Sequence, residues 1–196
     1  MKITAIQGIM LRCTCSPISD ALSTSTARQA LLVKIETDAG LYGIGEAFTY
    51  GAPLKIMKYL VEEQLGPMLI GQDPAEIEKH WNTMYWRTIA HGRRSMTMGA
   101  ISGIDIALWD LLGKAAHMPV CKLLGQHLDR VPSYASGGFY APGKDLHKLE
   151  DELEHYKAQG YRDMKIKIGR TLERSNAPLA YMANQDCAVS VEEDYK

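Results

Sequence analysis

The stretch that decides the fold is Tyr161–Gly169, which reads YRDMKIKIG. Its strict alternation predicts a β-strand with apolar residues on one face and Lys165 and Lys167 on the other. Residues two apart on one face lie roughly 6.5 Å from each other, so each ammonium disfavours the charge of its neighbour. A lysine that is neutral near pH 7 can act as a general base. A Lys-x-Lys pair on a solvated sheet face is the commoner alternative.

A predicted strand and helix precede this stretch. Val131–Ser136 has the pattern of a short strand, and Asp145 is the expected N-cap of a helix that ends at Gly160. Strand, helix and strand with short joints predict a parallel βαβ unit. If the unit opens a barrel, the apolar residues of the lysine strand pack outward on helices and both lysines point into the lumen. A lysine pair there is costly unless it is used, which favours the functional interpretation.

The N-terminal region is predicted to form a small antiparallel sheet. Its strands are Ile3–Leu11, Ala30–Thr37 and Leu41–Glu46, and the turn Asp38–Gly40 has glycine where a positive φ is needed. The segment Thr14–Thr26 between the first two strands is rich in serine and threonine. We expect a long polar loop there, which is either a lid over a site or merely flexible.

Three helices are predicted after the sheet. An apolar stripe covers Leu54–Leu65, and a second helix should begin at Asp73 as N-cap with Pro74 in its first turn. The third helix, about Thr97–Ala116, carries Asp105 on its apolar stripe. A carboxylate in that position should be paired or hydrogen-bonded, so we expect a structural role for it.

The composition is that of a globular chain. Its 196 residues are 46% hydrophobic and 23% charged, with a formal net charge of -1. That charge gives no electrostatic case for nucleic acid or a membrane surface as partner. We expect no membrane-spanning segment and no signal peptide, because no apolar run of about 18 residues occurs and the N-terminus lacks an apolar core. Four cysteines without metal-site spacing predict reduced thiols in a cytoplasmic protein.

Three segments together resemble one family. Ala100–Lys114 reads AISGIDIALWDLLGK, Pro119–Gly125 reads PVCKLLG, and Lys165–Lys167 forms the lysine motif. In this order they resemble the enolase superfamily, specifically its mandelate racemase and muconate lactonizing enzyme branch, over residues 1 to about 170. The resemblance implies an α+β capping domain at 1–118, followed at 119–196 by the first units of a (β/α) TIM-type barrel.

The resemblance also implies a chemistry. Members abstract a proton next to a carboxylate, and Mg²⁺ stabilises the resulting enediolate. Lys167 matches the lysine that acts as base, and Lys165 matches the one that tunes it. The segment Thr14–Thr26 matches a mobile loop over the substrate, and 47–53 matches a second one, which makes Tyr50 a candidate substrate contact.

Further candidate substrate contacts come from the same two regions. Ser23 and Thr24 lie in the expected lid, and Ser136 and Tyr140 follow the first predicted barrel strand. Polar residues at such strand ends often only satisfy backbone groups, so both interpretations of Ser136 and Tyr140 stay open.

A basic segment, His91–Arg94, is predicted as a compact loop before the third helix. Its Arg93 is a candidate to hold the carboxylate of an acid sugar, because guanidinium groups bind carboxylates in a bidentate manner. A solvated loop or a subunit contact is the competing interpretation, and we expect a homo-oligomer.

The resemblance places the acidic Mg²⁺ ligands on later barrel strands, so we expect them beyond Lys196. Four carboxylates near the end of the chain match no ligand-bearing strand end: Asp186, Glu192, Glu193 and Asp194. The predicted function is a Mg²⁺-dependent acid-sugar dehydratase with a small carboxylate substrate. A racemase, epimerase or cycloisomerase of the same superfamily is one alternative, and a catalytically inactive structural chain is another.

Overall fold

The computed structural model describes residues 1–21, 23–49, 51–169 and 192. By its internal contacts the chain divides into two compact units. The first, called here the N-terminal unit, comprises Met1–Cys13 and Gln29–His127. The second, called here the lysine unit, comprises Thr14–Arg28 and Leu128–Lys196. The units therefore do not follow chain order, unlike the domains 1–118 and 119–196 expected from the sequence.

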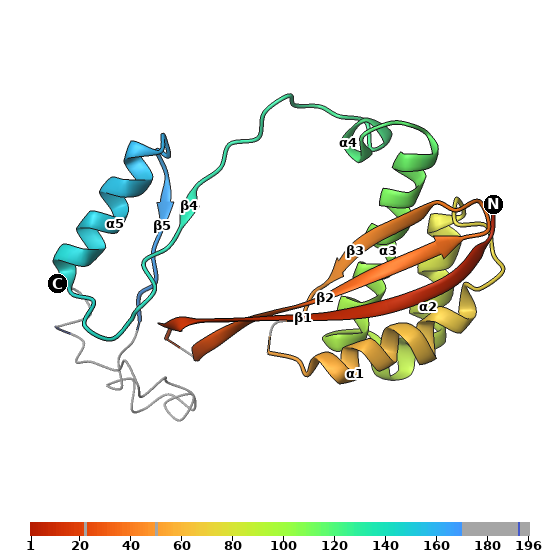
Figure 1. The fold of residues 1–196 in the computed structure, drawn as a ribbon, viewed down its shortest axis with the longest axis horizontal. Helices are drawn as coiled ribbons and strands as arrows, with labels where there is room; N and C mark the ends of the chain where they lie inside the picture. Colours follow the sequence, from red (N-terminus) through yellow and green to blue (C-terminus); the bar gives the residue numbers. More distant parts are fainter. Residues whose placement is uncertain (22, 50, 170–191, 193–196) are drawn as a thin grey trace. The chain divides into compact units, whose positions relative to one another are not determined.

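The predicted three-stranded sheet is present. Its strands are β1 (Ile3–Ser19), β2 (Thr24–Thr37) and β3 (Tyr42–Ala47), in the order β1-β2-β3 (Figure 1). The β2–β3 pair is antiparallel, with Leu31 opposite Ala47 at one end. Gly40 has φ 75° in the turn between them, as its place in the hairpin requires.

The prediction of a polar loop at Thr14–Thr26 is wrong. β1 continues to Ser19 and β2 begins at Thr24, so the segment is the end of a β-hairpin. The turn is closed because the amide of Ser23 donates to Asp20 Oδ1 at 2.9 Å and the amide of Asp20 donates to the carbonyl of Ser23 at 3.0 Å. Serine and threonine are frequent in loops, but β-branched threonine also suits an extended backbone, and here pairing decided the outcome.

The helices of the N-terminal unit follow the predicted order. They are α1 (Leu54–Tyr59), α2 (Ile77–Gly92) and α3 (Met96–Ala115). α1 continues as a π-helical turn over Leu60–Leu65 and a 3₁₀ turn over Gly66–Met68. A short helix, α4, closes the unit and spans four residues, Val120–Leu123.

The predicted start of the second helix at Asp73 is wrong, because α2 begins at Ile77. Asp73 instead closes a separate turn: its Oδ1 accepts from the amide of Ala75 at 3.0 Å. Its carbonyl oxygen lies 2.7 Å from Nε2 of His80, a residue only 2% exposed. These contacts hold the chain in a turn before the helix begins.

The core of the N-terminal unit lies between α3 and the sheet, and α3 runs along β3 (Figure 1). The apolar stripe predicted for α3 is fully buried at four positions: Ile101, Ile104, Leu108 and Leu111. Close approach of helix and strand depends on Gly45, where an added Cβ would lie 2.1 Å from the carbonyl oxygen of Gly103. The carboxylate of Asp110 accepts from the amide of Ile44 at 2.7 Å and so fixes the register of α3 on β3.

The expectation of no membrane-spanning segment needs one correction. The helix at Met96–Ala116 is long and apolar enough to cross a bilayer by length and composition, with a mean hydropathy of 1.2. Within the 18-residue window tested, 56% is buried inside the protein, so apolar residues of this helix belong to the hydrophobic core.

Asp105 does not have the partner that the sequence predicts. It is half-buried on α3 and makes no hydrogen bond or ion pair with the residues that the structure describes. Burial raises the pKa of its carboxyl, and the nearby charge of Glu78 raises it further. Asp105 is therefore a source of local instability at neutral pH.

The lysine unit contains the predicted parallel strand–helix–strand arrangement. Its elements are β4 (Ala135–Ser136), α5 (Leu146–Ala158) and β5 (Met164–Lys165). Ala135 lies opposite Met164 and Ser136 opposite Lys165, which confirms the parallel pairing. Both strands are two residues long, shorter than the predicted Val131–Ser136 and 164–168.

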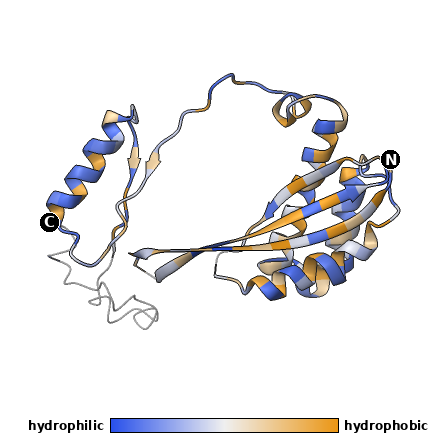
Figure 2. Ribbon diagram, in the orientation of Figure 1, coloured by the Kyte–Doolittle hydropathy of each residue, from blue (hydrophilic) through white to orange (hydrophobic). Residues whose placement is uncertain are grey.

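The start and end of α5 confirm the sequence prediction. The side chain of Asp145 accepts from the amide of Lys148 at 3.0 Å, and this bond lowers the pKa of the Asp145 carboxyl. Gly160, with φ 94°, follows the last turn. α5 is mostly hydrophilic with a few apolar bands (Figure 2), and none of its residues is buried.

The predicted packing of the lysine strand's apolar face on helices is not observed in the described residues. Met164 is half-buried, whereas Ile166 is 41% and Ile168 is 68% exposed. Ile166 does pack closely against Gly138: a Cβ added to that glycine would lie 2.7 Å from Cβ of Ile166.

Candidate functional site

The two lysines sit at and just beyond the end of β5. Lys165 is the last residue of the strand and is exposed, whereas Lys167 is half-buried. Two further backbone hydrogen bonds join these segments: the amide of Gly137 donates to the carbonyl of Lys165 at 2.9 Å, and the amide of Lys167 donates to that of Gly138 at 3.4 Å. The backbone of Lys167 is thus held just beyond the carboxyl end of a parallel pair, where α/β folds place their ligands.

Lys167 is contacted at both its side chain and its backbone by the segment that follows β4. Its Nζ lies 5.0 Å from the ring centroid of Phe139, within range of a cation–π interaction. The hydroxyl of Tyr140 donates to the carbonyl oxygen of Lys167 at 3.0 Å. Consecutive residues of one loop therefore hold the two ends of this lysine.

The loop itself is fixed by a carboxylate on α5. Glu152 Oε1 accepts from the amide of Gly138 at 3.1 Å and from the hydroxyl of Tyr156 at 2.7 Å. The other oxygen of Glu152 pairs with Lys144, whose Nζ also donates to the carbonyl of Phe139 at 2.8 Å. These contacts form a polar network that ties the loop 137–144 to α5.

Protonation of this network follows from its contacts. Burial alone would raise the pKa of the Glu152 carboxyl, but hydrogen bonds from Lys144, Tyr156 and the Gly138 amide outweigh burial and lower it. The hydrogen bond to Glu152, followed by burial, raises the pKa of the Tyr156 hydroxyl. Glu152 is therefore an anion at neutral pH and a fixed acceptor, unsuited to donating a proton.

The end of the β1–β2 hairpin belongs to the same unit. The amide of Ser19 donates to the carbonyl of Tyr140 at 2.8 Å, and the amide of Tyr140 donates back at 2.9 Å. Ser19 is 5% exposed, and its hydroxyl lies 2.7 Å from that of Thr24. The guanidinium carbon of Arg28 lies 5.9 Å from the ring centroid of Phe139.

Five residues predicted from the sequence as catalytic or substrate-binding lie in the lysine unit. Lys165, Lys167 and the exposed Ser136 lie on the paired strands. Ser23 closes the hairpin turn, and the hydroxyl of Thr24 is occupied by Ser19.

Arg93 belongs to the N-terminal unit, and the predicted loop His91–Arg94 needs correction. α2 extends through Gly92, and Nε2 of His91 lies 2.7 Å from Nε2 of Gln64. Arg93 is exposed in the short joint before α3, next to Ser95, which has φ 65°. Such a backbone is unfavourable for a residue other than glycine.

Other candidates fall on residues that the structure does not describe. Tyr50 lies outside the described residues, as do three of the four carboxylates near the end of the chain: Asp186, Glu193 and Asp194. The fourth, Glu192, is exposed. The role of Tyr50 as a substrate contact therefore stays a prediction from the sequence.

The described residues do not fit a metal centre. Within residues 1–21, 23–49, 51–169 and 192, no group of three or more histidine, cysteine, aspartate or glutamate side chains could hold an ion. Magnesium requires oxygen ligands, with one or more carboxylates in protein sites. Glu152 contacts the loop beside Lys167, but its oxygens are occupied by Lys144, Tyr156 and the amide of Gly138.

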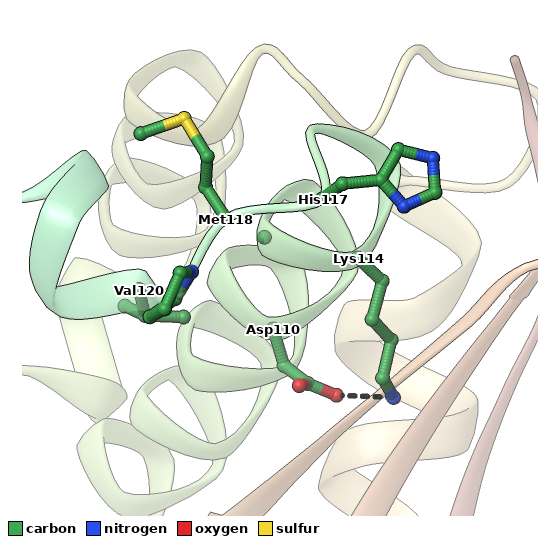
Figure 3. A pocket seen from close by; sticks show the side chains of 7 residues that line it. Asp110, Lys114, His117, Met118 and Val120 are labelled. Carbon is green, nitrogen blue, oxygen red and sulfur yellow. Dashed lines mark hydrogen bonds and ion pairs between the residues drawn. The ribbon is translucent and has the colours of Figure 1, made fainter.

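A shallow hollow of about 440 Å³ lies elsewhere, at the C-terminal end of α3. Figure 3 shows its Asp110–Lys114 ion pair (2.7 Å), with His117 on the following turn and its ring apart from that pair. Asp110 also accepts from the amide of Ile44. Both charged groups of this hollow are therefore engaged in holding α3 to β3.

Sequence reasoning missed the loop and the helix residues that support Lys167. Phe139 and Glu152 carry no motif, and their importance comes from contacts across the βαβ unit. Two signals were available: the pair Gly137–Gly138 directly after a strand, and the four-residue spacing of Glu152 and Tyr156 on one helix face.

Fold and site define a class of protein: a small antiparallel sheet covered by helices, followed by a parallel strand–helix–strand unit with a Lys-x-Lys pair. The chain belongs to the mandelate racemase / muconate lactonizing enzyme family, because the profile of that family's N-terminal domain matches residues 5–125. A solved member of the enolase superfamily from Polaromonas sp. JS666 has a TM-score of 0.80 at 34% identity, covering 89% of this chain and 46% of that one.

Two named dehydratases are also similar. The arabinonate dehydratase of Saccharolobus solfataricus is 40% identical over 141 residues, which is 72% of this chain and 38% of that protein. The L-talarate/galactarate dehydratase of Salmonella typhimurium LT2, liganded with Mg and L-lyxarohydroxamate, has a TM-score of 0.76 at 28% identity, covering 86% of this chain and 44% of that one. The chain thus spans less than half of each. The matches confirm the family and the predicted fold class, an α+β capping domain followed by the start of a (β/α) barrel.

Proposed function

We propose that the complete protein is an acid-sugar dehydratase in which Lys167 is the general base. The observation that carries this proposal is the position of Lys167 beyond the end of β5, with its Nζ over the ring of Phe139 and its carbonyl bound by Tyr140. The names of the similar proteins support the substrate class, because they act on arabinonate or on talarate and galactarate.

The proposed reaction begins when the neutral amine of Lys167 takes the proton from the carbon next to the substrate carboxylate. Negative charge then moves onto the carboxylate oxygens, where the ammonium of Lys165 stabilises it. Loss of hydroxide from the next carbon, with a proton, releases water and leaves an enol, which becomes a 2-keto-3-deoxy acid. We expect Ser136, which is exposed and opposite Lys165, to contact the substrate near these oxygens.

Magnesium belongs to this proposal as a component of the complete protein. When bound, it would supply positive charge to the substrate carboxylate as the enediolate forms. We expect its ligands outside the described residues, since those residues offer no fitting donor set. Homo-oligomeric assembly and a cytoplasmic location stay predictions from the sequence.

A racemase, epimerase or cycloisomerase is the second candidate, because all these reactions share the first step. The product distinguishes them. Incubation with a panel of aldonates and aldarates, followed by mass spectrometry, should show the loss of one water for a dehydratase. A product of unchanged mass would favour the second candidate.

Lys167→Ala tests the base directly in the protein at its natural length. We expect exchange of the substrate's α-proton with solvent deuterium to fall by about 10²–10⁴-fold, because the base performs the first step. The matched control is Lys157→Ala on α5, where Lys157 pairs with exposed Glu154 at 3.0 Å. Full exchange in Lys167→Ala, with the fold intact by circular dichroism, would remove Lys167 as the base.

A further inference from the structure

Phe139 is shared by two cations that come from distant parts of the sequence. Nζ of Lys167 lies 5.0 Å from its ring centroid, and the guanidinium carbon of Arg28 lies 5.9 Å from it. The electron-rich face of an aromatic ring attracts cations at such distances. The ring therefore restrains the side chain of Lys167 and contacts the hairpin at the same time.

Tyr140 makes a second connection between the same two partners. Its hydroxyl donates to the carbonyl of Lys167 at 3.0 Å, while its backbone exchanges two hydrogen bonds with Ser19 at 2.8 and 2.9 Å. A displacement of the hairpin would thus pull on the residue that holds the backbone of Lys167. Glu152 and Lys144 anchor the same loop to α5.

We propose that Phe139 and Tyr140 are positioning residues for Lys167, and that through them the docked hairpin Thr14–Arg28 sets the placement of this lysine. The role in catalysis rests on the proposed function. The mechanical link rests on the contacts of Phe139 and Tyr140 alone, so the two can fail separately.

The first test uses chemical labelling of amines in the substrate-free protein, with each lysine quantified by peptide mass spectrometry. Phe139→Leu removes the aromatic face but keeps an apolar side chain, so labelling of Lys167 should rise about two- to fivefold. Phe139→Trp keeps a π face and should restore the original rate, and exposed Lys165 serves as internal reference. Equal labelling of Lys167 in all three proteins would overturn the positioning role of Phe139.

The second test concerns Tyr140. Tyr140→Phe removes only the hydroxyl bound to the Lys167 carbonyl, and kcat for α-proton exchange should fall about two- to tenfold with little change in KM. The control is Tyr134→Phe, since Tyr134 is 56% exposed and makes no hydrogen bond or ring contact with the described residues. Equal kcat for both variants would overturn the role of Tyr140, whereas absence of exchange in the unaltered protein would overturn the proposed function instead.

The third test addresses the link to the hairpin. Arg28→Gln removes the second cation from Phe139, and the control Arg12→Gln removes an exposed arginine of β1 that lies outside Thr14–Arg28. We expect faster hydrogen exchange at the Tyr140 amide, and more labelling of Lys167, in Arg28→Gln alone. An unchanged Tyr140 amide, or a faster one without any change at Lys167, would overturn the link.

Discussion

The two units of the chain are held together by different forces. The N-terminal unit buries a continuous cluster of apolar side chains, including four residues of the apolar stripe predicted for α3; a fifth predicted residue, Ala115, is exposed. In the lysine unit the structure describes one buried hydrophobic residue, Ala135, and α5 has no buried residue. Its order comes from the network of Lys144, Glu152 and Tyr156 and from the hairpin bonds to Tyr140.

This difference shows which interactions fix individual side chains in place in this protein. Apolar burial stabilises a fold strongly but without direction, whereas hydrogen bonds and cation–π contacts fix single groups at defined distances. The predicted base lies in the unit that relies on directional contacts.

The largest effect is expected from a matched pair of leucines in two helices. Leu108→Ala in α3, fully buried, should lower the free energy of unfolding by about 2–5 kcal/mol through lost burial and a cavity. Leu146→Ala in α5, where the leucine is 56% exposed, should change it by less than about 0.5 kcal/mol. Urea denaturation of both variants measures the loss in free energy of unfolding. Equal losses would contradict the conclusion that only the N-terminal unit depends on apolar burial.

A smaller effect is expected from the polar network. Glu152→Gln should cost about 1–3 kcal/mol, because the Lys144 ammonium loses its charged partner, and hydrogen exchange at the Gly138 amide should quicken. Glu154→Gln on the exposed side of the same helix is the control.

The pH dependence of the network has a definite sign. Since the pKa of Glu152 is lowered in the folded state, its contribution is fully present above its ordinary value of 4.5. This stabilising contribution is lost as the pH falls through the pKa that Glu152 has in the folded state. Amide exchange at Gly138, corrected for intrinsic rates, should therefore lose protection in acid in the unaltered protein but not in Glu152→Gln. Parallel behaviour of both proteins would show that Glu152 does not hold the loop.

The smallest effect is expected at Asp105, and it has the opposite sign. Its pKa is raised in the folded state by burial and by Glu78, so the ionised carboxylate destabilises the N-terminal unit above that pKa. Asp105→Asn should raise the melting temperature. The gain in the free energy of unfolding should stay below about 1 kcal/mol, because water screens the charge of a half-buried group. The gain should shrink as the pH falls through the raised pKa. A gain that is constant between pH 7 and pH 4 would point to a cause other than charge.

The N-terminal unit was largely predictable because its elements carry their own signals. The stripe of α3 has the helical period, and the turn before β3 has glycine at the required position. The start of α2 was missed because an Asp-Pro pair serves equally well in a turn, and the contact of the Asp73 carbonyl with His80 decides between the two. Strand ends at Ser19 and Thr24 were missed because polar residues give no alternation in hydropathy.

For the site, the motif identified the lysines but not their surroundings. Lys165 and Lys167 stand in a recognisable spacing, whereas Phe139 and Glu152 are ordinary residues whose roles depend on distance in space. The partner predicted for Asp105 does not exist among the described residues, because burial of a carboxylate on a stripe does not guarantee a donor nearby. A local sequence pattern indicates the period of an element and the chemistry of its side chains. Contacts between residues far apart in the sequence can be seen only in the structure.

The backbone pairing of Ser19 with Tyr140 has a consequence for the order of events during synthesis. Ser19 leaves the ribosome about 120 residues before its partner, which at roughly 5–20 residues per second is a delay of about 6–24 s. During that interval the end of the hairpin lacks its later partner, and an unpaired strand edge is a template for wrong association. The backbone of Ser19 therefore lacks this partner until Tyr140 emerges, and we expect stalling upstream of that codon to increase capture of the nascent chain by chaperones.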